Sequence, residues 1–168
     1  MKNRKLSSHI LFLCQAGIIA ALYVVLTGLS SLFGLSSGVI QVRISESLCI
    51  LPLFTPAAVP GVTIGCLISN LLWGNGPWDV IFGTLASLLG VLGACCFRRA
   101  LPYLAPLPTV LANTLILPFV LKYALHLEDS IYFLAITIFA GEAIAAWALG
   151  LLLFWALKKR FPLLSTTK

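Results

Sequence analysis

Several polar and aromatic residues stand inside long apolar stretches of this sequence. The clearest is Glu142, which interrupts the apolar run 131–157 and has only glycine, alanine and isoleucine close to it. A charged group at the centre of a bilayer is costly, so such residues usually face the interior of a helix bundle and mark a binding or transport path. The alternative is a protonated or paired acid that serves packing alone.

The other candidates combine carboxylates, amides, one guanidinium and two indole rings. Ionised carboxylates only accept hydrogen bonds, so they suit a ligand rich in N–H donors, such as a guanine-like edge. Indole rings can stack on a flat base. We therefore predict a binding pocket that opens to the outer side of a membrane. Its lining residues come from five helices, including the helix of Glu142: Arg43, Glu46, Asn70, Trp73, Trp78, Asp79, Asn113 and Glu142.

Most of these residues also have a simpler interpretation. Arg43 and Glu46 are three residues apart, so on a helix they share a face and could pair with each other. Tryptophan is enriched at membrane interfaces, and Asp79 could cap a helix N-terminus. We expect a solvated outer loop at Lys122, His126, Glu128 and Asp129.

Composition indicates that lipid is the solvent. Of the 168 residues, 60% are hydrophobic and 10% are charged, against about 25% charged in an ordinary soluble domain. A small soluble domain cannot cover so much apolar surface. This excludes a cytosolic enzyme, a disordered chain and a secreted disulfide scaffold. It predicts an all-α integral membrane protein with a single membrane domain over residues 1–168.

Catalysis, cofactors and nucleic acid find no support in the sequence. The net charge of +6 sits in short basic clusters between apolar runs, which indicates membrane orientation and not nucleic-acid binding. The five cysteines lack CxxC spacing and lie in apolar runs, where cysteine behaves as a small hydrophobe. No HExxH motif or nucleophile with a base is present. We expect neither an enzyme nor a metal or cofactor site.

Run lengths predict where the chain crosses the membrane. About 20 apolar residues span the hydrocarbon core, and runs 10–29, 80–97, 103–121 and 131–157 qualify. The stretch 44–72 holds Pro52, Pro56 and Pro60, so it is either two helices or one long kinked helix. We expect the first run to be a retained helix and not a signal peptide.

Basic residues decide between five and six spans. With six, the clusters at 2–5, 98–99 and 158–160 all fall on one side, and the positive-inside rule makes that side cytoplasmic, with both termini. We predict six transmembrane helices, near 9–31, 38–54, 58–73, 79–98, 104–123 and 130–159.

The first span carries small residues at four-residue spacing. Ala16 and Ala20 form AxxxA, and Gly17 and Ala21 form GxxxA beside it. Small residues four apart make a flat strip on which another helix packs closely. That helix could belong to a partner protein or to the same bundle.

Taken together, these features resemble the S component, or substrate-binding subunit, of an energy-coupling factor (ECF) transporter. The segments VRISESLCILPLFTPAAVPGVTIGCLISNLL (42–72), WDVIFGTLASLL (78–89) and LAPLPTVLANTLILP (104–118) are similar to the QueT family. The resemblance covers roughly residues 10–157, and RISE with TPAAVPG is its specific part.

The QueT resemblance implies a ligand and partners. The ligand would be a queuosine precursor, meaning a 7-deazaguanine base or queuine. The partners would be a transmembrane coupling protein, the T component, and two cytoplasmic ATPases in a prokaryotic cell membrane. The chain itself has no Walker motif for ATP. It offers only Ala16 and Ala20, with Gly17 and Ala21, in place of a longer alanine strip. The family's motif positions are matched here by Arg43, Glu46, Asn70, Asp79 and Asn113.

Two alternatives remain open from the residues. The chain could be an S component for another small vitamin-like molecule. It could also be a stand-alone proton-coupled carrier, with Glu142 as the proton site. Small size and the lack of a detectable internal repeat favour the S component over the carrier.

Overall fold

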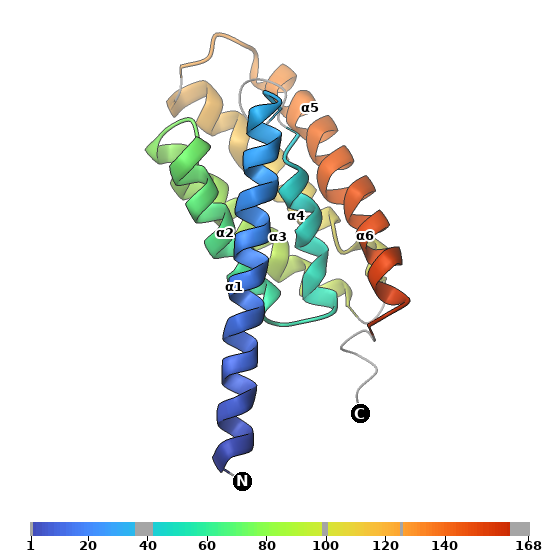
Figure 1. Ribbon diagram of the computed structural model, residues 1–168. Helices are drawn as coiled ribbons and strands as arrows, with labels where there is room; N and C mark the ends of the chain where they lie inside the picture. The colour runs from blue at the N-terminus through green and yellow to red at the C-terminus, as the bar shows by residue number, and fades with distance from the viewer. Residues whose placement is uncertain (1, 36–41, 99–100, 125, 162–168) are drawn as a thin grey trace.

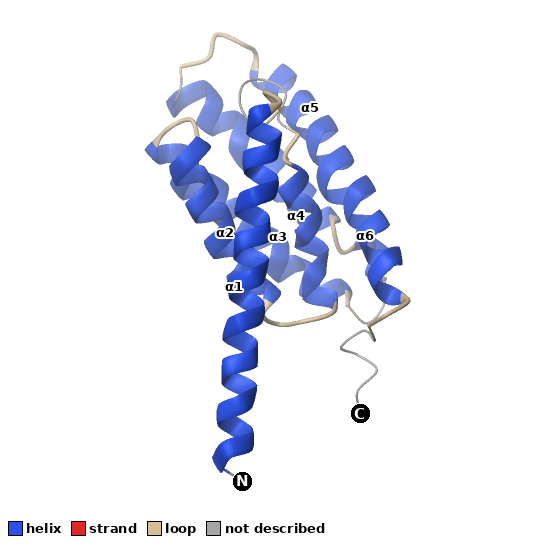
Figure 2. Cartoon of the chain, in the orientation of Figure 1, coloured by secondary structure: helices blue, strands red, loops and turns tan. Residues whose placement is uncertain are grey.

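The fold is a bundle of helices. The computed structural model describes residues 2–35, 42–98, 101–124 and 126–161, and every regular element in these ranges is helical (Figure 2). The α-helices are α1 (Lys2–Leu32), α2 (Ala58–Trp73), α3 (Pro77–Phe97), α4 (Leu107–Phe119), α5 (Ile131–Glu142) and α6 (Leu149–Lys158). The all-α class predicted from composition is confirmed.

Short segments of other helix types join or extend these helices. Two are 3₁₀ helices, η1 (Ile44–Leu53) and η2 (Pro102–Leu104). Two are π-helical, η3 (Val120–Ala124) and η4 (Ala143–Ala148). Because η4 continues α5 directly into α6, residues 131–158 form one long helix. This is the helix predicted near 130–159.

Four helical stretches in the described residues are long and apolar enough to cross a membrane. They are Ser8–Leu32, Pro77–Phe97, Pro102–Ala124 and Ile131–Lys158, and the shorter apolar helices η1 and α2 accompany them. The prolines of 44–72 do break this stretch into two helices. The second helix was predicted from residue 38, but η1 begins only at Ile44; residues 38–41 lie outside the described part of the chain.

The 3₁₀ helix η1 lies at the centre of the bundle. It contacts α1, α2, α3, η4 and α6, and eight of its ten residues are buried. A 3₁₀ helix rises about 2.0 Å per residue, so η1 is roughly 20 Å long, about 5 Å longer than the same residues in an α-helix. At the C-terminal end of η1, Nη2 of the Arg98 side chain donates a hydrogen bond to the Pro52 carbonyl oxygen (2.7 Å).

Helices α1 and α2 pack through glycines of α2. A Cβ added at Gly61 would lie 2.9 Å from the Ala16 carbonyl oxygen, and one at Gly65 would lie 2.9 Å from that of Ala20. Ala16 and Ala20 therefore face α2, which is the packing alternative for the AxxxA half of the strip. Gly17 and Ala21 are exposed.

The chain enters and leaves the bundle at the same end. Figure 1 shows that α1 begins, and α6 ends, at the end of the bundle away from the turn between α2 and α3. An even number of passes through the bundle produces this arrangement. The long first helix α1 extends beyond the others at this end (Figure 1).

The close contact between α1 and α2 predicts a matched pair of alanine variants. Gly65→Ala should destabilise the protein by about 1–3 kcal/mol, because its Cβ would lie 2.6 Å from that of Tyr23. Gly17→Ala should be neutral or stabilising, since nothing lies within 4 Å of its Cβ and alanine favours helix. Thermal unfolding in detergent measures both. Equal melting temperatures for the two variants would contradict the close packing.

Candidate binding site

Arg43 enters the bundle directly before η1 and pairs with groups on α2 and α3. Its Nη1 donates to Asn70 Oδ1 at 2.9 Å, and its Nη2 lies 3.4 Å from Asp79 Oδ2 in a buried ion pair. The partner of Arg43 is thus Asp79, and not Glu46 as one interpretation of their spacing suggested. The ion pair ties the beginning of η1 to the beginning of α3.

Asp79 also stabilises the start of α3. The N-cap of this helix is Gly76, so Asp79 lies in the first turn and is not the cap itself. Its Oδ2 accepts a hydrogen bond from the backbone N–H of Asn75 at 3.1 Å. A carboxylate here also interacts favourably with the positive end of the helix dipole. One oxygen therefore serves the turn and the ion pair together.

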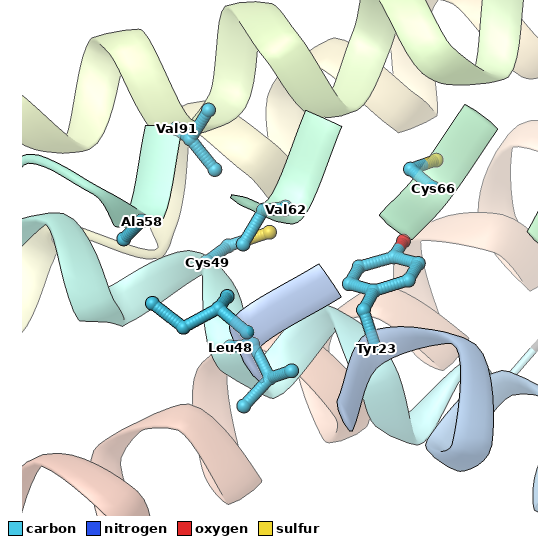
Figure 3. Packing of buried hydrophobic residues seen from close by; sticks show 8 residues of the cluster. Tyr23, Leu48, Cys49, Ala58, Val62, Cys66 and Val91 are labelled. Carbon is cyan, nitrogen blue, oxygen red and sulfur yellow. The ribbon is translucent and has the colours of Figure 1, made fainter. Parts of the chain in front are cut away.

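Glu46 is almost completely buried, at 1% exposure, and receives three donors. The Tyr23 hydroxyl of α1 and the Ser87 hydroxyl of α3 donate to Oε1, the latter at 3.1 Å. The Cys49 thiol donates to Oε2 at 3.1 Å. Cys49 can do so because residues three apart eclipse on a 3₁₀ helix. Tyr23 and Cys49 also belong to a buried apolar cluster, which Figure 3 shows.

Cys66 connects the two groups of polar residues. Asn70 Nδ2 donates to Cys66 Sγ at 3.4 Å, and the Cys66 thiol donates to Ser87 Oγ at 3.3 Å. Hydrogen bonds therefore connect Arg43 to Glu46 through the side chains of Asn70, Cys66 and Ser87. Cysteines were expected to act only as small hydrophobes, whereas buried Cys49 and Cys66 also donate hydrogen bonds.

Glu142 lies at the junction of α5 and η4. Asn113 Nδ2 of α4 donates to its Oε1 at 2.8 Å. Its Oε2 is buried and has no hydrogen-bond partner among the described residues. The π-helical turn that follows Glu142 is a rare conformation that occurs often at functional sites.

The structure thus buries six of the predicted site residues, in two hydrogen-bonded groups, and leaves two others at the surface. The six come from η1 and its first flanking residue, α2, α3, α4 and α5, and all are buried: Arg43, Glu46, Asn70, Asp79, Asn113 and Glu142. Trp73 and Trp78 are 37% and 51% exposed. Their positions match the membrane-interface alternative, and the stacking role stays a prediction.

Trp78 lines a different feature of the surface. Its ring stacks on Phe82 with centroids 6.1 Å apart. Both rings border an apolar groove of about 670 Å³, whose other wall includes Phe119 and Tyr123. The side chains of this groove come from α3, α4 and η3, and carboxylates and amides are missing from its lining.

Sequence reasoning missed four partners in the polar centre: Tyr23, Cys49, Cys66 and Ser87. Two of them had a detectable signal. Cys49 is three residues after Glu46 on η1, and Cys66 is four before Asn70 on α2, so each shares a helix face with a predicted site residue. Tyr23 and Ser87 lie far from Glu46 in sequence, and only the packing of α1 and α3 on η1 brings them to it.

The chemistry of the site is that of a buried, acceptor-rich cluster of side chains in an apolar helical bundle. The described residues contain no group of three histidine, cysteine or acidic residues able to hold a metal ion. Spanning helices around buried carboxylates and amides define a multi-pass membrane protein whose interior suits a polar ligand. Residues 13–159 match the family described as QueT transporter, and the chain belongs to this family.

A curated relative supports this membership. The "Queuosine precursor transporter QueT" of Lactococcus lactis subsp. cremoris (strain MG1363) is 45% identical over 84 residues. The alignment covers 49% of this chain and 48% of the relative, or about half of each. No solved structure matches the chain. The QueT resemblance predicted from the motifs is confirmed, and the family is one of transporters.

The buried ion pair predicts the effect of neutralising one partner. Asp79→Asn should destabilise the protein by about 3–5 kcal/mol, because Arg43 is then left as a buried charge without a counterion. Asp129→Asn, in the segment between η3 and α5, should change stability by less than about 0.5 kcal/mol. Thermal unfolding in detergent provides the comparison. A small effect of Asp79→Asn would show that the pair is unimportant for the fold.

Proposed function

We propose that this protein is the substrate-binding S component of an ECF-type importer. It captures a queuosine precursor, a 7-deazaguanine base or queuine, at the outer face of a prokaryotic cell membrane for ATP-driven uptake. The observation that carries the proposal is the buried group of acceptors from five segments that centres on Glu46 and Glu142. The name of the Lactococcus relative, a queuosine precursor transporter, supports the ligand class.

The carboxylates explain recognition of such a base. Ionised Glu46 and Glu142 accept hydrogen bonds from N–H groups of the ligand, which a guanine-like edge supplies in a row. Asn70 and Asn113 can both donate and accept, so they suit ring nitrogens and carbonyl groups. Trp73 or Trp78 would stack on the ring after turning inward from the exposed positions described above.

Six passes with both termini in the cytoplasm agree best with the arrangement of the chain. The start of α1 and the end of α6 lie at the same end of the bundle (Figure 1), and basic clusters occur in the sequence at 2–5, 98–99 and 158–160. The positive-inside rule makes that end cytoplasmic. Arg43 and Asp79 then lie toward the outer mouth, where a ligand enters.

Energy for uptake would come from partners. The S component would bind a T component that carries two cytoplasmic ATPases, and tilting of the S component would deliver the ligand inward. Gly17 and Ala21 are the exposed half of the small-residue strip, and small side chains let a partner helix approach closely. Ala16 and Ala20 lie behind them and hold α2.

A proton-coupled carrier is the second candidate. The buried and unpartnered Oε2 of Glu142 favours it, because intramembrane acids commonly relay protons. Uptake into vesicles of the purified chain alone, driven by a proton gradient, would identify this carrier. Uptake that requires ATP and the partner proteins would identify the S component.

Replacing the carboxylates by amides tests the binding site. Glu46→Gln and Glu142→Gln should each weaken queuine binding by roughly ten- to a hundredfold, since a charge-assisted hydrogen bond contributes about 1.5–3 kcal/mol in a dry pocket. Glu128→Gln should leave affinity unchanged, because this side chain is exposed in the outer loop. Titration of each purified variant with queuine measures these affinities. Unchanged affinity in both test variants would place the pocket elsewhere.

Bulk on the exposed strip tests the partner interface. Ala21→Trp should retain ligand binding but abolish uptake in a complete transporter, because close approach of a partner helix requires small side chains. Leu152→Trp, at an exposed position on α6, is the control and should transport normally. Uptake assays in cells measure transport, and co-purification of the T component measures association with the partner. Normal uptake by Ala21→Trp would show that the interface lies on another face.

A further inference from the structure

A row of hydrogen-bonded side chains crosses the interior of the bundle. In order, its members are Arg43, Asn70, Cys66, Ser87 and Glu46. All five side chains are buried, and none is more than 5% exposed. Water therefore competes poorly for these bonds, and each polar group depends on its neighbours in the row.

The two ends of the row fix the direction of its bonds. A guanidinium group can only donate, so Asn70 presents its Oδ1 to Arg43 Nη1 (2.9 Å). The amide nitrogen of Asn70 then points the other way and donates to Cys66 Sγ (3.4 Å). At the far end an ionised carboxylate can only accept, so the Ser87 hydroxyl donates to Glu46 Oε1 (3.1 Å). The donors are thus arranged in one direction, from the guanidinium group to the carboxylate.

Cys66 lies in the middle of the row and must both accept and donate. Its sulfur accepts from Asn70 Nδ2, and its single S–H group donates to Ser87 Oγ at 3.3 Å. The Gly83 carbonyl oxygen is a competing acceptor at the longer distance of 3.8 Å. Gly83 also leaves room for the amide, because a Cβ there would lie 2.9 Å from Asn70 Nδ2. An apolar residue at position 66 would interrupt the row and leave Asn70 and Ser87 each without one bond.

We propose that Cys66 and Ser87 are positioning residues for ligand binding, which hold the Glu46 carboxylate in one orientation without touching the ligand themselves. The proposal rests on the function proposed above, in which Glu46 accepts hydrogen bonds from the ligand. Bonds in a directed row polarise one another in a site of low dielectric constant. Each bond before Ser87 therefore strengthens the donor that fixes Glu46.

The number of acceptor sites on Glu46 explains why its orientation matters. An ionised carboxylate has about four lone-pair sites. The Tyr23 and Ser87 hydroxyls both donate to Oε1, and the Cys49 thiol donates to Oε2. About one site, on Oε2, is therefore left for a ligand. When Ser87 holds Oε1 less firmly, the carboxylate can rotate, and this last site no longer points in one direction.

Paired substitutions at position 66 separate hydrogen bonding from the loss of volume. Cys66→Ser and Cys66→Ala both remove the large sulfur atom, but only the serine hydroxyl can accept from Asn70 and donate to Ser87. In titrations of the purified protein with queuine, Cys66→Ala should bind roughly three- to tenfold more weakly than the wild type. Cys66→Ser should stay within about twofold of the wild type. The control Cys14→Ala, at an exposed position on α1, should bind normally.

Infrared spectroscopy of the S–H stretch tests the row without any ligand. The band of Cys66 is the one that Cys66→Ser lacks, and it should have the frequency of a hydrogen-bonded thiol. Ser87→Ala should move this band toward the frequency of a free thiol, because only the more distant Gly83 carbonyl oxygen remains as an acceptor. Cys14→Ala should leave the band in place. A role of Cys66 in packing alone would produce neither this shift nor the rescue by serine.

The outcomes distinguish this inference from the function on which it rests. Equal losses of affinity in Cys66→Ala and Cys66→Ser would overturn the positioning role, and so would unchanged affinity in Cys66→Ala. A Cys66 band that does not respond to Ser87→Ala would overturn the row itself. In each of these cases queuine still binds the wild-type protein, and the proposed function stands. Failure of the wild-type protein to bind queuine would overturn the proposed function and, with it, the positioning role.

Discussion

The need to satisfy buried charge in a lipid-surrounded bundle dominates this structure. Arg43 lies between the start of η1 and the first turn of α3, and its ion pair with Asp79 connects them. Loss of either partner would leave a buried charge, which is far more costly than the pair is stabilising. The same pair connects the turn before α3 to the site, because Asp79 also accepts from the Asn75 backbone. Asp79 thereby couples the position of this turn to the positions of η1 and α3.

The 3₁₀ form of η1 determines how the site is assembled. Its three-residue repeat places Glu46 and Cys49 on one face, and its length carries the chain through the bundle in ten residues. Donors from α1 and α3 then converge on one carboxyl group, while Arg98 binds the opposite end of the helix. A movement of η1 would therefore affect all the elements that it contacts, namely α1, α2, α3, η4 and α6.

Small residues serve two purposes in α1. Ala16 and Ala20 allow the glycines of α2 to approach the backbone, and this contact places Tyr23 next to Glu46. Gly17 and Ala21 point away from α2 and are exposed. One edge of the strip therefore packs within the bundle, while the other edge is exposed.

The sequence by itself determined the solvent, the helical class and most of the candidate residues. Apolar run lengths, proline positions and intramembrane acids act locally along the chain, so spans and buried polar positions could be predicted from them. Tertiary structure alone decided which groups meet. Arg43 pairs with Asp79, 36 residues away, and Glu46 meets Ser87, 41 residues away, because three helices pack around η1. The direction in which each half of the strip faces, and the outward positions of Trp73 and Trp78, were likewise set by packing. Periodicity shows which residues share a helix face, but only the neighbouring helices determine what that face contacts.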